Sequence, residues 1–149
     1  MLHRRNFIGL VLAAPLLARP ALAASPDIFA IDGVAIRGAD PVAFFTDGAA
    51  TQGKSENALM WRGAYWHFAS PENRALFEAD PTAYAPQYGG YCAYAMSKGA
   101  VATSVPEAWT VYEGKLYLNY STPVRGIWSQ DIPGNIAKAD SHWPGILAV

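Results

Sequence analysis

The chain has 149 residues, with 11 basic and 12 acidic side chains and a net charge of −1 at pH 7. Beyond residue 23 the basic residues are scattered singly, so no positive face is predicted there that would bind nucleic acid or a charged membrane surface. This length suits one domain with one core and leaves no room for a second.

The first 23 residues have the layout of an export signal. Arg4 and Arg5 precede an apolar run over residues 10–18, which is too short to cross a bilayer stably. Ala21 and Ala23 give the small-x-small pattern that a signal peptidase cleaves, so cleavage is expected after Ala23. Paired arginines ahead of Asn-Phe-Ile are similar to the twin-arginine signal, and an ordinary secretory signal is the alternative. We therefore expect a periplasmic protein without a stable membrane anchor.

Cleavage after residue 23 would make the mature chain more acidic. It removes three arginines and no acid, so 8 of the 11 basic residues and all 12 acidic ones remain in residues 24–149. The resulting net charge of about −4 further argues against nucleic acid as a partner. Residues 24–149 are predicted to form the functional domain.

Three apolar segments are each interrupted by a polar-glycine pair that is typical of a hairpin turn. The pairs are Asp32-Gly33, Arg62-Gly63 and Glu113-Gly114. Residues 64–68 are apolar on both alternating faces, which predicts a strand covered on each side. Residues 115–120 alternate, so Leu116, Leu118 and Tyr120 are expected to share one face.

Helix signals follow two of these hairpins. Ser70 is the expected N-cap of a helix over residues 71–79, in which Phe77 is predicted to face the core. Asp80-Pro81 would end this helix, and Ser121-Thr122-Pro123 would begin another. Apolar residues at helical spacing predict a last helix around Ile132, Ile136 and Ala139. Antiparallel hairpins and short helices together predict a small α+β domain.

One stretch of the sequence resembles a known family. Residues 65–81, together with Asp40-Pro41-Val42 and Tyr84, resemble the YHS domain, a small treble-clef-like module that binds metal. The strand, the serine cap, the phenylalanine seven residues later and the D-P-x-x-Y ending match in order and spacing. Residues 88–93, 107–110 and 131–140 are similar to a longer exported branch of that family. The resemblance implies a YHS-like domain over nearly all of residues 24–149.

The metal-binding cysteines of that family are missing here. YHS domains that bind metal place cysteines after D-P-V, after the strand phenylalanine, and three residues beyond the cap serine. Those positions hold Ala43, Ala69 and Asn73 in this chain. Thiolates are the ligands that such a site offers to zinc or copper, and alanine offers none. The resemblance therefore does not by itself imply metal binding.

Cys92 is the only cysteine, so no internal disulfide can form. It follows Gly89-Gly90, which permit a tight turn, and its thiol is expected at the start of an element. Met96 lies four residues on, and a thiolate with a thioether suits Cu(I). His67 could replace a lost cysteine as a ligand. The alternatives are that Cys92 and Met96 are core residues and that His67 is a half-buried strand residue.

Three functions remain open at this stage. The first is a non-enzymatic periplasmic binding protein that holds copper or a similar soft metal through Cys92, with Met96 and His67 as further ligands. The second is a thiol redox protein in which Cys92 reacts with a partner or a small thiol. The third is an interaction module whose cysteine is structural. Motifs for hydrolases, phosphate-binding loops and zinc proteases are absent from the sequence.

Overall fold

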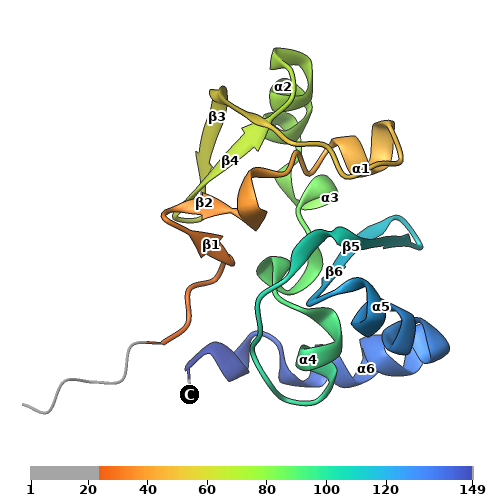
Figure 1. Ribbon diagram of the computed structural model, residues 1–149. Helices are drawn as coiled ribbons and strands as arrows, with labels where there is room; N and C mark the ends of the chain where they lie inside the picture. Colours follow the sequence, from red (N-terminus) through yellow and green to blue (C-terminus); the bar gives the residue numbers. More distant parts are fainter. Residues whose placement is uncertain (1–23, 149) are drawn as a thin grey trace, which may run out of the picture.

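The computed structural model describes residues 24–148, so the predicted export signal lies outside the described residues (Figure 1). One half of the domain is built on a four-stranded sheet with the order β1-β2-β4-β3. Its strands are β1 (Ala30–Ile31), β2 (Val34–Ala35), β3 (Lys54–Trp61) and β4 (Ala64–Phe68). Strands β2 and β4 pair in parallel, and the other neighbours are antiparallel.

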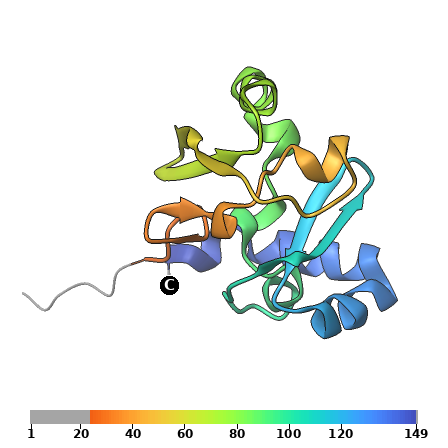
Figure 2. The same cartoon turned by 45° about the horizontal axis from the view of Figure 1, so that its top comes forward.

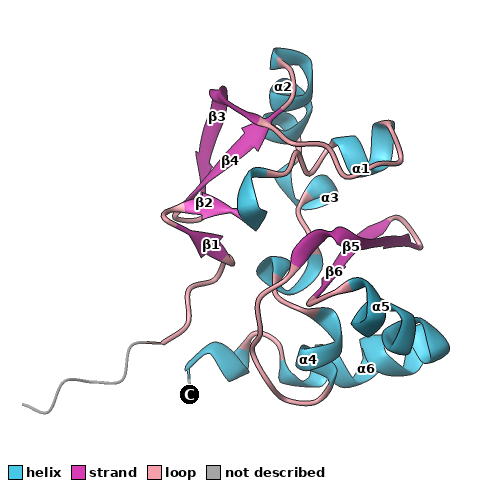
Figure 3. Ribbon diagram, viewed as in Figure 1, coloured by secondary structure: helices cyan, strands magenta, loops and turns pink. Residues whose placement is uncertain are grey.

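The other half is built on an antiparallel hairpin (Figure 3). Its strands are β5 (Val105–Tyr112) and β6 (Lys115–Asn119). The helices of the described chain are α1 (Ala43–Thr46), α2 (Pro71–Ala79), α3 (Pro81–Tyr84), α4 (Ala93–Ser97), α5 (Thr122–Trp128) and α6 (Ile132–His142). Single 3-10 turns are η1 (Ile36–Gly38), η2 (Gln87–Gly90), η3 (Ser129–Asp131) and η4 (Gly145–Ala148).

These two halves meet through α3 and η2, which pass between the four-stranded sheet and the β5–β6 hairpin (Figures 1 and 2). Helix α2 packs against β3 and β4, whereas α4 packs against α6 and β6. Buried residues from both halves nevertheless form one contiguous hydrophobic cluster. The predicted small α+β domain is therefore confirmed.

All three predicted hairpin turns are present. Asp32, Arg62 and Glu113 have φ of 51°, 48° and 49°, and a glycine with positive φ follows each. Two successive left-handed residues match the twist of antiparallel strands, and the pairing of a tolerant polar residue with glycine permits this conformation.

The predicted helix caps are also confirmed. Ser70 Oγ accepts the Asn73 backbone N–H at 3.1 Å, and Ser121 Oγ accepts that of Val124 at 3.2 Å. Each hydroxyl satisfies one of the backbone donors that a helix start leaves unpaired. Helix α2 has the predicted bounds, and Asp80 separates it from α3, which begins at Pro81.

Phe77 anchors the core of the first half, as predicted. Its ring centroid lies 5.4 Å from that of Trp61, 5.3 Å from that of Trp66 and 5.1 Å from that of Phe68. Phe77, Trp66 and Phe68 are fully buried. Aromatic side chains thus supply much of the buried area of a small domain.

One prediction about a strand face is wrong, and a second holds only for Leu116 and Leu118. In β4, Trp66 is buried but Tyr65 is 50 % exposed, because α2 covers only the face that carries Trp66 and Phe68. In β6, Tyr117 and Asn119 are buried along with Leu116 and Leu118. Both faces of that strand are therefore covered, and Tyr120 lies beyond its end with 56 % of its surface exposed. Among the described helices, none is long and apolar enough to span a bilayer.

Candidate functional site

Cys92 stands at the N-cap of α4, as the sequence predicts. Its Sγ accepts the backbone N–H of Ala95 at 3.4 Å and that of Tyr120 at 3.2 Å, and the thiol donates to Asn119 Oδ1 at 3.6 Å. The side chain is 1 % exposed. A neutral thiol has one weak donor and a weakly accepting sulfur, so protein groups already use its hydrogen-bonding capacity.

Asn119 completes this arrangement from the end of β6. It is fully buried, and its Oδ1 accepts the backbone N–H of Tyr94 at 3.0 Å as well as the thiol. The Cys92–Asn119 pair therefore ties the end of β6 to the start of α4. Sequence reasoning missed Asn119, although a lone amide at the end of an apolar strand is the kind of buried polar group that must find partners.

Met96 lies one helical turn after Cys92. Its backbone N–H donates to the Cys92 carbonyl oxygen at 3.0 Å, and its side chain is fully buried in the hydrophobic cluster. The flexible thioether fills core space here as methionine commonly does. The structure thus places Cys92 and Met96 on the same short helix, and both lie inside the core.

His67 lies apart from these two residues. It belongs to β4 in the sheet half of the domain, whereas α4 lies beyond the β5–β6 hairpin (Figures 1 and 2). Its half-buried imidazole borders a shallow groove with Gly38 and Gln52. Within residues 24–148, no group of three or more His, Cys, Asp or Glu side chains is arranged to hold a metal ion.

Ala43, Ala69 and Asn73, the three positions to which the resemblance drew attention, meet around Asp40. This carboxylate is fully buried and accepts the backbone N–H groups of Ala43 at 3.3 Å and Ala69 at 2.8 Å and the Asn73 side-chain amide at 2.8 Å. A fourth donor is the Val42 backbone N–H at 2.9 Å. Four donors compensate the cost of burying a carboxylate. Sequence reasoning missed this role of Asp40.

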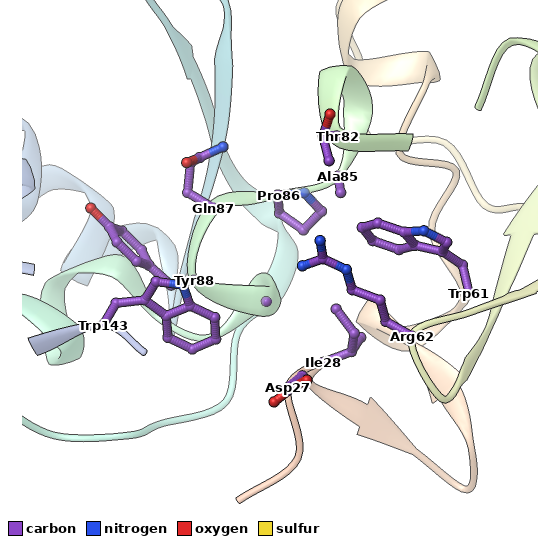
Figure 4. Close-up of a pocket in the computed structure, with 11 residues that line it drawn as sticks. Asp27, Ile28, Trp61, Arg62, Thr82, Ala85, Pro86, Gln87, Tyr88 and Trp143 are labelled. Carbon is purple, nitrogen blue, oxygen red and sulfur yellow. The ribbon is translucent and has the colours of Figure 1, made fainter. Parts of the chain in front are cut away.

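A cleft lies where the Arg62-Gly63 turn between β3 and β4 faces η2 (Figure 4). It has a volume of about 200 Å³. The Arg62 guanidinium lies between Trp61 and Pro86, and Trp143 stands on the opposite wall beside Tyr88. The remaining lining residues are Asp27, Ile28, Thr82, Ala85, Gln87 and Gly89.

The floor of this cleft is held in a left-handed turn. Tyr88, Gly89 and Gly90 have φ of 58°, 62° and 86°. A Cβ on Gly89 would lie 1.9 Å from the Asp27 carbonyl oxygen, so the two segments approach as closely as glycine permits. The Phe29 backbone N–H donates to the Gly89 carbonyl at 2.9 Å. The floor is thereby fixed against the segment that precedes β1.

A second left-handed turn, over residues 36–38, is joined to the first by hydrogen bonds. Ile36, Arg37 and Gly38 have φ of 43°, 58° and 79°, a conformation that a β-branched residue rarely adopts. Ser104 joins the two turns, since its Oγ donates to the Gly90 carbonyl at 2.6 Å and its own carbonyl accepts Arg37 Nε at 2.8 Å. Backbone in such strained conformations persists only where its surroundings hold it firmly.

Tyr88 supports the Trp143 wall of the cleft. Its ring lies 6.2 Å from that of Trp143 in an edge-on arrangement, and its hydroxyl donates to Asp140 at 2.9 Å. Burial raises the pKa of the Tyr88 hydroxyl well above its usual range, and the hydrogen bond to Asp140 adds to this. Tyr88 therefore stays neutral and holds α6 against η2.

Comparisons of this chain with protein-family models, with curated proteins and with solved structures found no match.

Proposed function

We propose that this protein is an exported, YHS-like binding module without catalytic activity, which takes a small ligand in the cleft beside Arg62. The cleft carries this proposal. It combines aromatic walls, a charged group and a rigid floor, and small-molecule sites are typically concave, mostly apolar and equipped with a few placed polar groups.

The surroundings of Cys92 favour a structural thiol over the copper and redox hypotheses. Two backbone N–H groups donate to its sulfur and Asn119 accepts from its thiol, all within a buried setting. A copper ligand would have to give up these bonds, and a redox thiol would have to reach a reagent from a side chain that is 1 % exposed. His67 would in addition have to cross from the sheet half of the domain.

The gathering of positions 43, 69 and 73 around one centre supports the YHS-like part of the proposal. In place of a metal, the Asp40 carboxylate joins the start of α1 to the end of β4 and to α2. This is the same joining role that a bound metal serves in a small structural site. In this proposal, hydrogen bonds to the Asp40 carboxylate link the elements that thiolates bound to a metal would link in a metal-binding YHS domain.

Two-dimensional NMR with single-ring fragments tests the proposal. Fragments that bind should shift the indole N–H signals of Trp61 and Trp143 and the amide signal of Gly89. The Cys92→Ser variant should give the same shifts, because the thiol does not line the cleft. The proposal is overturned if no fragment perturbs these signals, or if the protein isolated from its own compartment carries stoichiometric copper that Cys92→Ser loses.

A further inference from the structure

Building on the cleft proposed above as the ligand site, we infer that its ligand is a small monocarboxylate with one planar apolar ring. Three features of the cleft point to this class of molecule: the orientation of Arg62, the size and walls of the cavity, and the position of Asp27.

Arg62 is set up to receive a carboxylate. Its Cζ lies 4.5 Å from the centroid of the Trp61 ring, so the guanidinium makes a cation–π contact with that ring. The N–H donors lie in the guanidinium plane and stay available at its edge. Figure 4 shows the guanidinium between Trp61 and Pro86 at the cleft. The Arg62 side chain is exposed, so its donors can reach a carboxylate that enters the cleft and bind it through two parallel hydrogen bonds.

The size of the cleft suits a small ring. An enclosed cavity of roughly 150 Å³ can hold a benzene molecule, so a cleft of about 200 Å³ has room for one six-membered ring and a carboxylate within its walls. Trp143, Pro86, Ile28 and Ala85 offer apolar surface to that ring. Stacking on an indole favours a planar ring over a branched alkyl group.

The Asp27 carboxylate disfavours a ligand that carries two negative charges. Asp27 lines the same cleft as Arg62, so one acid and one base border the site. A monoanion can pair with Arg62 while its ring lies nearer to Asp27. A dianion such as a phosphate monoester would keep an unpaired charge near the Asp27 carboxylate, and this repulsion lowers its affinity.

Titration with matched probes tests the inference. Phenylacetate should bind, with saturable shifts of the Trp61 and Trp143 indole signals, and phenylacetamide of the same shape should bind about ten- to a hundredfold more weakly. Phenyl phosphate should also bind more weakly than phenylacetate, and Asp27→Asn should narrow that difference.

Variants separate this inference from the function on which it rests. Arg62→Gln should weaken phenylacetate about ten- to a hundredfold and leave phenylacetamide unchanged. Arg125→Gln is the matched control, since it removes an exposed arginine that donates to Thr110 on the other half of the domain. If both probes bind alike, or Arg62→Gln has no effect, the ligand class is overturned while the cleft stands. If neither probe nor any single-ring fragment shifts the cleft signals, both proposals fail.

Discussion

Asn73 donates its side-chain amide to Oδ2 of Asp40 at 2.8 Å, across 33 residues of sequence. This bond connects the first turn of α2 to the loop before α1, and the same oxygen accepts the Ala69 backbone N–H. A buried carboxylate with amide donors therefore joins the loop before α1, the end of β4 and the first turn of α2.

Asp40→Asn should destabilise the fold strongly. The new NH₂ group would face backbone N–H donors and could not accept hydrogen bonds from them. Breaking a buried, hydrogen-bonded charged arrangement typically lowers the free energy of unfolding by about 3 to 5 kcal/mol. Equilibrium unfolding in urea measures the effect. Asp47→Asn is the control, since Asp47 is exposed at the end of α1 and its loss should cost less than about 0.5 kcal/mol. Equal effects of the two substitutions would refute the role of Asp40.

Phe77→Ala should cost about 3 to 5 kcal/mol of unfolding free energy, because the ring is fully buried among Trp61, Trp66 and Phe68. Leu76→Ala is a matched control on the same helix, where the side chain is 43 % exposed. It should cost about 1 kcal/mol or less. Chemical denaturation of both variants measures the difference, and a similar loss for each would mean that α2 does not present Phe77 to the core.

Phe77 and Asp40 show which features the sequence alone can predict. Local chemistry is sufficient for the hairpin turns, the serine caps and the burial of Phe77, because each depends on residues close together in the chain. Asp40 depends on partners 29 and 33 residues away, and its bonds with them arise only when β4 and α2 fold onto the loop before α1. The local sequence around Asp40 does not indicate these distant partners, so its buried role could not be predicted.

The candidate site follows the same rule. Glycines before Cys92 predict a thiol at an element start, and α4 begins there. Two partners of the sulfur, however, are Asn119 at the end of β6 and Tyr120 just beyond it, and no local pattern links them to Cys92. The cleft beside Arg62 joins segments near residues 27, 61, 86 and 143, so no single motif carries it. The exposed face of β4 was mispredicted for a related reason, since only packing decides which side of a strand α2 covers.

Alkaline pH should reduce stability in a manner that depends on Tyr88. Its pKa is raised by burial and by the bond to Asp140, so the folded protein keeps a proton that the unfolded chain loses near pH 10. This contribution is complete below pH 10 and is lost as pH rises further, at about 1.4 kcal/mol per pH unit for each such tyrosine. Burial raises the pKa of Tyr91 and Tyr117 in the same direction.

Urea unfolding between pH 9 and about 11.5 measures this dependence. Tyr88→Phe should reduce the slope of unfolding free energy against pH by the amount that corresponds to roughly one proton released on unfolding. A slope identical to that of the parent protein would show that Tyr88 ionises as easily when folded as when unfolded.

The export signal provides a separate prediction. Replacing both Arg4 and Arg5 by lysine should leave the precursor in the cytoplasm, because lysine cannot reproduce the planar guanidinium pair that a twin-arginine receptor recognises. Cell fractionation followed by immunoblotting measures the distribution. Lys54→Arg, far from the signal, serves as a control for altered expression. Unimpaired export of the double variant would contradict the twin-arginine assignment.

The most direct test of the central claim that Cys92 is a structural thiol, and neither a metal ligand nor a redox group, is its alkylation rate in the native protein, with and without Cu(I) held by a competing chelator. A structural thiol that is 1 % exposed and bonded to Ala95, Tyr120 and Asn119 should label slowly until the protein unfolds, and copper should not change the rate. Rapid labelling of the folded protein below neutral pH would indicate a redox thiol. Protection by copper that the chelator cannot remove would indicate a metal ligand, and either result would contradict the account.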